Sequence, residues 1–294
     1  SEIKCDLYED LIIPQGYIVS AVPGCQINLH NSAKIISYSP LRFFGKSDSL
    51  ITITSTDSTG QGMIVFNCEH TSELSYVKFN DLSNISDIGW NLTGAVTFYE
   101  APVNINNCTF RNNLNGDDYL NIIRTNFNIT NTKFENTYAD AFDADFCTGS
   151  IISATFINIG NDAIDVSGSK LKLKTIGIEY PGDKGISAGE RSHLICKDID
   201  ITGGEIAIAS KDNSIIELNN INITSCKLAY VAFQKKSEFG PGKIVVKNAI
   251  SVDVETEYLV ENGSSLSING NQINKKSKKV KEMLYGKEYG KSSK

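Results

Sequence analysis

The chain has 294 residues and lacks most of the patterns that mark membrane proteins and common enzymes. No stretch reaches the roughly 18 apolar residues that a membrane-spanning helix needs, so no membrane span is predicted. The seven cysteines form no Cys-x-x-Cys pair, which argues against a zinc site. The three histidines have no carboxylate partner in register, and no Gly-x-Ser-x-Gly, P-loop, kinase or His-Glu-x-x-His motif is present.

The chain also lacks an excess of positive charge. Its formal net charge is −6 and its pI is about 5.2, which argues against nucleic acid as a main partner. Positive charge is most concentrated in residues 275–294, which we predict to be a separate basic C-terminal tail. This tail reads as a partly helical cap or a solvated arm, or alternatively as an attachment to an anionic polymer or membrane surface.

A repeat of 22 residues runs through the middle of the chain. Similar five-residue segments recur at this step: Asp117–Asn121, Ala139–Asp143, Asn161–Asp165, Asp183–Ser187 and Glu205–Ala209. A fixed period of this size indicates a solenoid, in which each repeat buries its apolar face against its neighbours. We therefore predict one elongated domain over residues 1–274.

The repeat is built from strands, because apolar and polar residues alternate within it. A first apolar column occupies the fourth position of each segment: Leu120, Phe142, Ile164, Ile186, Ile208 and Tyr230. Two further columns are Ile129, Ile151, Leu173, Ile195 and Leu218, and then Phe134, Phe156 and Ile178. Short strands in turns of about 22 residues predict an all-β fold, a three-sided right-handed parallel β-helix with capped ends. Residues 81–93 and 233–242 interrupt the pattern and are expected to be loops that leave the stack.

Carboxylates crowd two adjacent repeats. Stacked coils place matching residues about 4.8 Å apart, so this group of five should share one face: Asp140, Asp143, Asp145, Asp162 and Asp165. Like charges at this spacing repel unless a cation, a shared proton or a salt bridge compensates them. Three interpretations stay open: a Ca²⁺ site formed by Asp143, Asp145 and Asp165, acid–base catalysis on a sugar, or a structural ladder of turn residues.

Charges of both signs continue downstream of this group. Arg124, Lys184, Glu190 and Lys235 are candidate substrate-binding residues for an acidic polymer, and Lys211 is a candidate catalytic base for β-elimination. The alternative is a salt-bridge network on one face of the solenoid, with no catalytic role.

The period and the strand pattern resemble the pectin-lyase-like superfamily of right-handed β-helices. Asp140-Ala141-Phe142-Asp143 and Gly160-Asn161-Asp162-Ala163-Ile164 are similar to the Asn-Thr-Asp and Gly-Asp-Asp segments of polygalacturonase-type glycoside hydrolases. The resemblance implies catalytic carboxylates at Asp140 or Asp143 and at Asp162. The family's Gly-His-Gly and Arg-Ile-Lys segments have no counterpart in the next repeats.

Residues 92–100, 160–169 and 233–241 are similar to β-helix regions found beside CotH-type domains in large exported bacterial proteins. This resemblance implies a secreted or cell-surface location, and a place within a larger exported protein. Two functions follow from the sequence. The first is a module that binds carbohydrate or acts as a rigid scaffold. The second is a polysaccharide hydrolase or lyase centred on Asp140, Asp143, Asp162 and Asp165, so whether the chain is an enzyme stays open.

Overall fold

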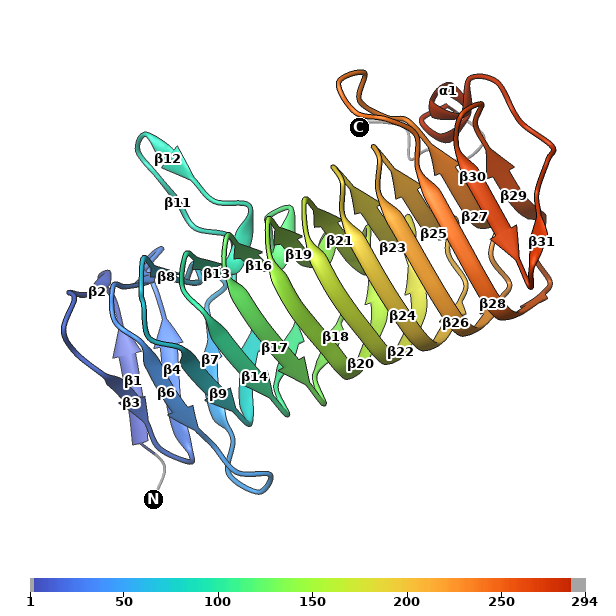
Figure 1. The fold of residues 1–294 in the computed structure, drawn as a ribbon. Coiled ribbons are helices and arrows are strands. Elements are labelled where there is room, and N and C mark those ends of the chain that lie inside the picture. The colour runs from blue at the N-terminus through green and yellow to red at the C-terminus, as the bar shows by residue number, and fades with distance from the viewer. Residues whose placement is uncertain (1–2, 287–294) are drawn as a thin grey trace. The chain divides into compact units, whose positions relative to one another are not determined.

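The computed structural model describes residues 3–286 and divides into two compact units, Ser1–Ser150 and Ile151–Lys294. Almost all regular structure in the described residues is β-strand, and the one helix there is α1 (Val280–Leu284). In each unit, strands of successive coils pair in parallel, as Figure 1 shows. The predicted parallel β-helix is therefore confirmed. No helix in residues 3–286 is long and apolar enough to cross a membrane.

The first unit contains strands of two sheets, here called sheet A and sheet B, and one hairpin. The strands of sheet A are β1 (Ile3–Leu7), β3 (Val19–Ala21), β4 (Cys25–Leu29), β6 (Leu41–Phe44), β7 (Ile51–Thr54), β9 (Ser72–Ser75), β10 (Val77–Asn80), β14 (Val103–Asn106), β15 (Thr109–Arg111), β17 (Asn126–Thr130) and β18 (Lys133–Glu135). The strands of sheet B are β2 (Leu11–Ile13), β5 (Ile35–Ser37), β8 (Met63–Phe66), β13 (Gly94–Tyr99), β16 (Asp118–Ile123) and β19 (Asp140–Asp145).

The second unit repeats this arrangement with longer strands. Its strands in sheet A are β22 (Lys170–Pro181), β24 (His193–Thr202), β26 (Ile215–Thr224), β28 (Lys243–Val252), β30 (Ser265–Ile268) and β31 (Asn271–Gln272), and β20 (Thr148–Ile159) begins before the division between the units. Its strands in sheet B are β21 (Ile164–Ser167), β23 (Lys184–Gly189), β25 (Ile206–Lys211), β27 (Leu228–Phe233) and β29 (Thr256–Val260).

The regular coils bend at three corners, and most of these corners contain a residue in the left-handed region. One corner carries Asn131, Ser153, Thr175, Asp198 and Asn220, all with φ between 49° and 64°. Asn and Asp tolerate this conformation because their short polar side chains bond locally to the backbone. The frequent Asn, Asp, Ser and Gly residues of the sequence are thus explained by the corners of a three-sided coil.

The core of each unit consists of the predicted apolar columns. All six residues of the first column, from Leu120 to Tyr230, are fully buried, and Leu120 pairs with Phe142 as the 22-residue step requires. In the first unit the rings of Phe79, Phe110 and Phe134 stack on successive coils, with centroids 4.7 and 4.9 Å apart. This column of rings fills the centre of the coils by close packing.

The prediction that Ile195 belongs to the second apolar column is wrong. Cys196 pairs with Leu173 and with Leu218 and is buried, whereas Ile195 is 48% exposed. The one-residue insertion lies before β24, one coil earlier than the sequence pattern suggested. Since side chains alternate between the two faces of a strand, this one inserted residue exchanges the inward and outward positions of β24 relative to those that the 22-residue step predicted.

Residues 81–93 leave the stack as predicted and contain a short antiparallel hairpin, β11 (Ser86–Asp87) with β12 (Trp90–Asn91), which projects at the upper left of Figure 1. The side chain of Asp87 reaches the ammonium of Lys34 at 3.3 Å, and Asp10 approaches the same ammonium at 2.9 Å. Lys34 is almost fully buried between these carboxylates. This contact anchors the hairpin to the earlier coils.

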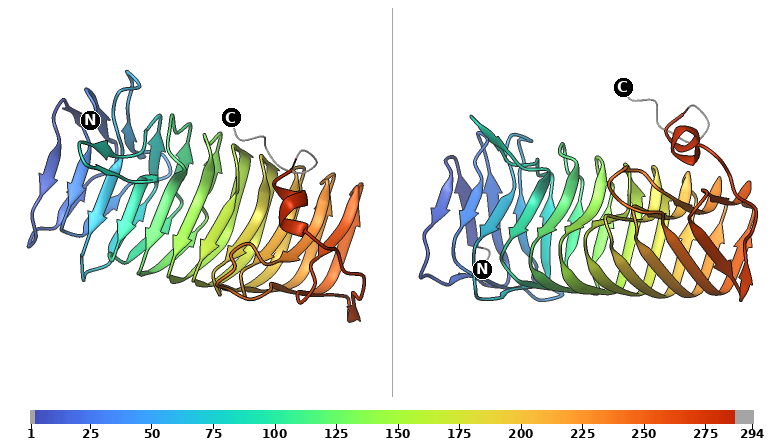
Figure 2. Two further views of the ribbon diagram at one scale, coloured as in Figure 1. Left: turned by 90° about the horizontal axis from the view of Figure 1, so that it is seen from above. Right: turned by 45° about the horizontal axis from the view of Figure 1, so that its top comes forward.

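The two ends of the chain differ in how the apolar surface is covered. In the first coils, β1, β2 and β3 each pair with one later strand only, and large apolar side chains there are exposed, among them Ile12, Tyr17 and Ile18. At the other end β31 folds back on β30, and α1 follows. Figure 2 shows α1 lying over sheet B of the second unit.

Candidate functional site

The outward face of sheet B in the first unit carries a column of polar residues. Thr97 pairs with Asn121, and Asn121 pairs with Asp143, so these side chains follow one another on successive coils. Asp118 and Asp140 form a second column beside the first. Asp143 and Asp145 occupy alternate positions of β19 and so lie on the same face. The 22-residue period predicted these columns.

Asn121 joins two of these carboxylates. Its Nδ2 donates to Asp118 Oδ2 at 2.9 Å, to Asp143 Oδ2 at 3.3 Å and to Thr93 Oγ1 at 3.2 Å. Burial raises the pKa of Asp118 to about 6, against the hydrogen bonds from Asn121 and Thr93, which lower it. Asn121 Oδ1 is buried and has no hydrogen-bond donor among the described residues. The column is therefore a row of polar side chains in which one acceptor, Asn121 Oδ1, has no donor within residues 3–286.

An open hollow adjoins this column, between the hairpin and the corners before β16 and β19. It measures about 330 Å³ and is lined mainly by amide, hydroxyl and carboxylate groups with one aromatic ring: Asn84, Asn91, Leu92, Thr93, Asn115, Gly116, Asp117, Tyr138 and Ala139. We call it the Tyr138 hollow. Asn84 Nδ2 donates to Asn91 Oδ1 and to the Leu92 carbonyl, which fixes the hairpin side of the hollow. Thr93 connects the hollow to Asn121.

Arg124 lies at the rim of the same face. Its Nη1 donates to the Tyr99 hydroxyl at 3.2 Å, and its guanidinium lies 5.9 Å from the centre of the Phe146 ring. Tyr99 belongs to an outward aromatic column, in which the rings of Tyr38, Phe66 and Tyr99 are 5.8 and 6.0 Å apart. The sequence singled out Arg124 but gave no indication of this aromatic neighbour.

In the second unit, the predicted carboxylates pair with lysines. Lys184 Nζ donates to Asp162 Oδ1 at 3.3 Å and also to Asp183 Oδ2, while the Lys184 backbone N–H donates to Asp162 at 3.0 Å. Burial alone would lower the pKa of Lys184, but the carboxylates of Asp162 and Asp183 outweigh it and the pKa is raised. Lys184 thus stays charged and forms an ion pair with Asp162.

Lys211 and Asp165 form the next pair, with Nζ 3.4 Å from Oδ1. Lys211 is buried, and although burial would lower its pKa, the charge of Asp165 leads the opposing effects and the pKa is raised. A catalytic base needs a lysine that loses its proton near neutral pH. The surroundings of Lys211 favour the opposite state.

The remaining predicted residues lie beside these pairs. Glu190 forms a salt bridge with Lys236. The ammonium of Lys235 lies 5.3 Å from the centre of the Tyr285 ring, and Lys281 Nζ donates to the Lys235 carbonyl at 2.7 Å. The loop after β27 is therefore attached to the segment that contains α1.

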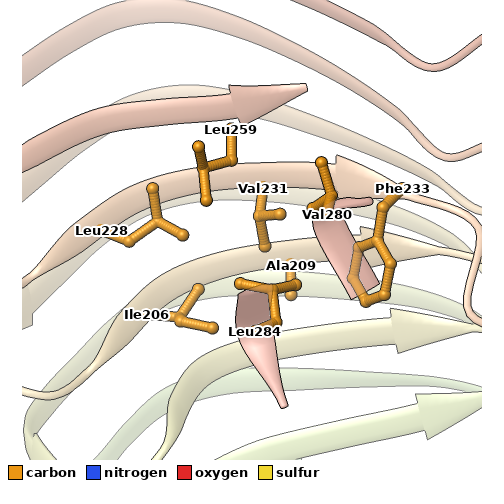
Figure 3. Close-up of a cluster of buried hydrophobic side chains, with 8 residues drawn as sticks. All are labelled: Ile206, Ala209, Leu228, Val231, Phe233, Leu259, Val280 and Leu284. Carbon is orange, nitrogen blue, oxygen red and sulfur yellow. The ribbon is translucent and has the colours of Figure 1, made fainter. Parts of the chain in front are cut away.

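The helix α1 packs against sheet B of the second unit. Its Val280 and Leu284 are buried in one apolar cluster, drawn in Figure 3, with residues from three neighbouring strands: Ile206, Ala209, Leu228, Val231, Phe233 and Leu259. These strand residues occupy the outward positions that hold charged groups on β21 and β23. The outward face of this sheet thus changes from charged to apolar, and α1 covers the apolar part.

The candidate Ca²⁺ ligands fall in both units. Asp143 and Asp145 belong to the first unit, where Asp143 accepts the bond from Asn121, and Asp165 belongs to the second, where it pairs with Lys211. Carboxylate oxygens suit Ca²⁺. A Ca²⁺ site formed by these three residues remains a prediction.

Sequence reasoning placed Asp118 and Asn121 in columns but did not select them, because it could not see that burial shifts the pKa of Asp118. It missed the column of Tyr38, Phe66 and Tyr99 for a different reason. The early coils differ in length, so these residues stand 28 and 33 positions apart and break the period.

No family model matches the chain, and no curated protein matches it. Among solved structures it is similar to the catalytic domain of a GH87 alpha-1,3-glucanase in complex with tetrasaccharides, with 8% identity and a TM-score of 0.45, covering 90% of this chain and 62% of that one. It is also similar to pectate lyase Pel9A (11% identity, TM-score 0.42, 83% and 70% covered) and to an alginate lyase from Paenibacillus sp. str. FPU-7 (10%, 0.37, 82% and 97%). The chain spans less than two thirds of the glucanase domain. Likenesses this low assign no residue and no activity to this chain.

Proposed function

We propose that this chain is a carbohydrate-binding β-helix module that holds a polysaccharide at the Tyr138 hollow. One observation carries the proposal. The hollow combines an exposed tyrosine with a dense set of amide and hydroxyl groups, whereas the matching face of the second unit is occupied by ion pairs and α1.

The chemistry of the hollow suits a sugar. Asn84 and Asn91 bond each other and leave the Asn84 Oδ1 acceptor and the Asn91 Nδ2 donors for sugar hydroxyls, and the Asn115 amide adds both kinds of group. Tyr138 is 62% exposed and offers an apolar ring with a polar end.

The setting of the module is part of the same proposal. We infer that the chain is secreted or displayed at the cell surface, within a larger exported protein of the CotH-associated kind. Its corners and faces, rich in Asn, Ser and Thr, offer polar groups to a glycan over much of the described surface.

A polysaccharide hydrolase or lyase is the second candidate, and one observation favours it. Asp118, with a pKa raised to about 6, and Asp143 both accept from the same amide of Asn121. Glycosidases use a pair of carboxyl groups, one of which has a raised pKa. Asp118 is however only 2% exposed, so a sugar would reach Asp143 more readily than Asp118. Asp140, Asp143, Asp162 and Asp165 of the sequence-based set belong to this second candidate, whereas the raised pKa of Lys211 disfavours it as the base.

Trp90 offers a direct test, because it is the single tryptophan and precedes Asn91 in the hairpin beside the hollow. We expect its fluorescence to change on titration with at least one polysaccharide, and the Tyr138→Ala variant to bind that polysaccharide about tenfold more weakly. Tyr180→Ala is the matched control, since Tyr180 is 59% exposed and lies in the second unit. Equal loss in both variants, or no response to any glycan, would remove the support for binding at the hollow.

Asp143→Asn separates binding from catalysis. If the chain is a binding module, this variant keeps its affinity within a few-fold, and neither protein releases reducing ends or unsaturated products from the bound polysaccharide. Release of products by the wild type that stops in Asp143→Asn would establish the enzyme instead.

A further inference from the structure

A second, larger hollow lies in the first coils, away from the polar column. It measures about 580 Å³ and is formed at three successive corners, those after β2, β5 and β8. Its lining mixes exposed aromatic, amide and acidic side chains: Gln15, Tyr17, Ile18, Tyr38, Glu69 and His70. We call it the Tyr38 hollow.

Tyr38 is the aromatic residue at the middle corner of this hollow. Phe66 stacks against its ring from the following coil, at 5.8 Å and with an angle of 20° between the rings. Tyr38 remains 40% exposed and lines the hollow. Gly16, on the preceding corner, has no atom within 4 Å of where a side chain would begin, so that part of the hollow is open. The Tyr38 side chain is therefore accessible from the hollow.

The corners that form the hollow are held in place by bonds between coils. Ser39 Oγ donates to the Pro14 carbonyl at 2.7 Å and accepts from the Tyr17 backbone N–H at 3.0 Å. Arg42 Nη1 donates to the Thr71 carbonyl, which ties the third corner to the second. Because these bonds hold the corners in place, the protein loses less conformational entropy when a ligand binds there than it would at a mobile loop.

We propose that the Tyr38 hollow is a separate carbohydrate site that takes one uncharged pyranose ring, stacked on Tyr38 and hydrogen-bonded by Gln15, Glu69 and His70. Glu69 is the one carboxylate of the lining, so the site repels acidic sugars and favours neutral ones. A pyranose presents C–H bonds on one face and hydroxyls at its edge, which fits an aromatic face bordered by polar groups. The site extends the proposed carbohydrate binding, but it depends on none of the residues of the Tyr138 hollow.

The test uses the methyl pyranosides of glucose, galactose and mannose as probes of the full chain. We expect saturation-transfer NMR to show contact between one of these probes and aromatic protons, and calorimetry to give an affinity that Tyr38→Ala lowers at least tenfold. Glu69→Gln should lower it several-fold while leaving the melting temperature unchanged, which guards against a folding defect in Tyr38→Ala. Tyr180→Ala is again the control and should bind as the wild type does.

The inference would be overturned by no binding of any methyl pyranoside, or by binding that Tyr38→Ala and Glu69→Gln leave unchanged. A dimer that dissociates in Tyr38→Ala would also overturn it, since the hollow would then be an interface between copies.

The two sites can fail independently. Trp90 fluorescence reports the Tyr138 hollow, and it should keep its response to polysaccharide in Tyr38→Ala. If Trp90 never responds but pyranoside binding depends on Tyr38, the proposed function at sheet B fails and the Tyr38 site stands. The reverse pattern removes the Tyr38 site alone.

Discussion

Replacing Lys184 with methionine tests whether Asp162 has a structural role. The change removes the ammonium that lies 3.3 Å from Asp162 Oδ1 and that also bonds Asp183, and it leaves Asp162, which is 2% exposed, without its cation. Breaking a buried ion pair at one partner costs about 3–5 kcal/mol in the free energy of unfolding. At about 2–4 °C per kcal/mol for a chain of this size, Lys184→Met should melt roughly 6–20 °C below the wild type.

The double variant Asp162→Asn with Lys184→Met is the control for this prediction. It removes both charges, and the amide of Asn can still accept from the backbone N–H of residue 184, which Asp162 now does at 3.0 Å. We expect it to recover most of the lost stability, measured by urea unfolding at pH 7. A loss below about 1 kcal/mol in Lys184→Met, or a double variant less stable than the single one, would refute the reasoning.

Three further predictions concern other parts of the chain. Contrary to the prediction from the sequence, His30 does have carboxylate partners: it is bonded to Asp57 and Asp6, which raise its pKa. Its contribution to stability is therefore complete below about pH 6.5 and is lost as pH rises through the folded-state pKa, and melts from pH 5 to 9 should show this loss in the wild type and not in His30→Gln. Burial raises the pKa of Asp118 to about 6, so stability should fall as pH rises from about 4 to 6, and this fall should be smaller in Asp118→Asn. Leu284→Asp should release α1 and speed amide exchange in β25 and β27 while β13 and β16 stay protected, and unchanged exchange would contradict the covering role of α1.

The fold could be predicted from the sequence because the residue pattern that produces it repeats along the chain. The coils from about residue 118 to 233 repeat the same inward apolar positions and mostly left-handed corners, so columns such as Leu120 to Tyr230 appear in the sequence at a constant step. Where a coil gains one residue, as before β24, the step slips, and Ile195 was placed on the wrong face for that reason alone.

The candidate sites could be predicted only in part. The period placed Asp140, Asp143 and Asp145 on one strand, but it could not show that Asn121 bonds Asp143, or that Asp162 and Asp165 pair with lysines within the second unit. The two hollows lie beside irregular segments, the hairpin at 81–93 and the first corners, where no period exists. No spacing rule could have brought Tyr138 together with Asn91, or Tyr38 with Glu69.

The measurement that most directly tests carbohydrate binding is a titration of Trp90 fluorescence with a panel of neutral and acidic polysaccharides, in the wild type, Tyr138→Ala and Tyr180→Ala. We predict a saturable response to at least one polysaccharide that Tyr138→Ala weakens about tenfold and Tyr180→Ala leaves unchanged. No response across the panel, or a response that both variants preserve, would contradict the proposed function.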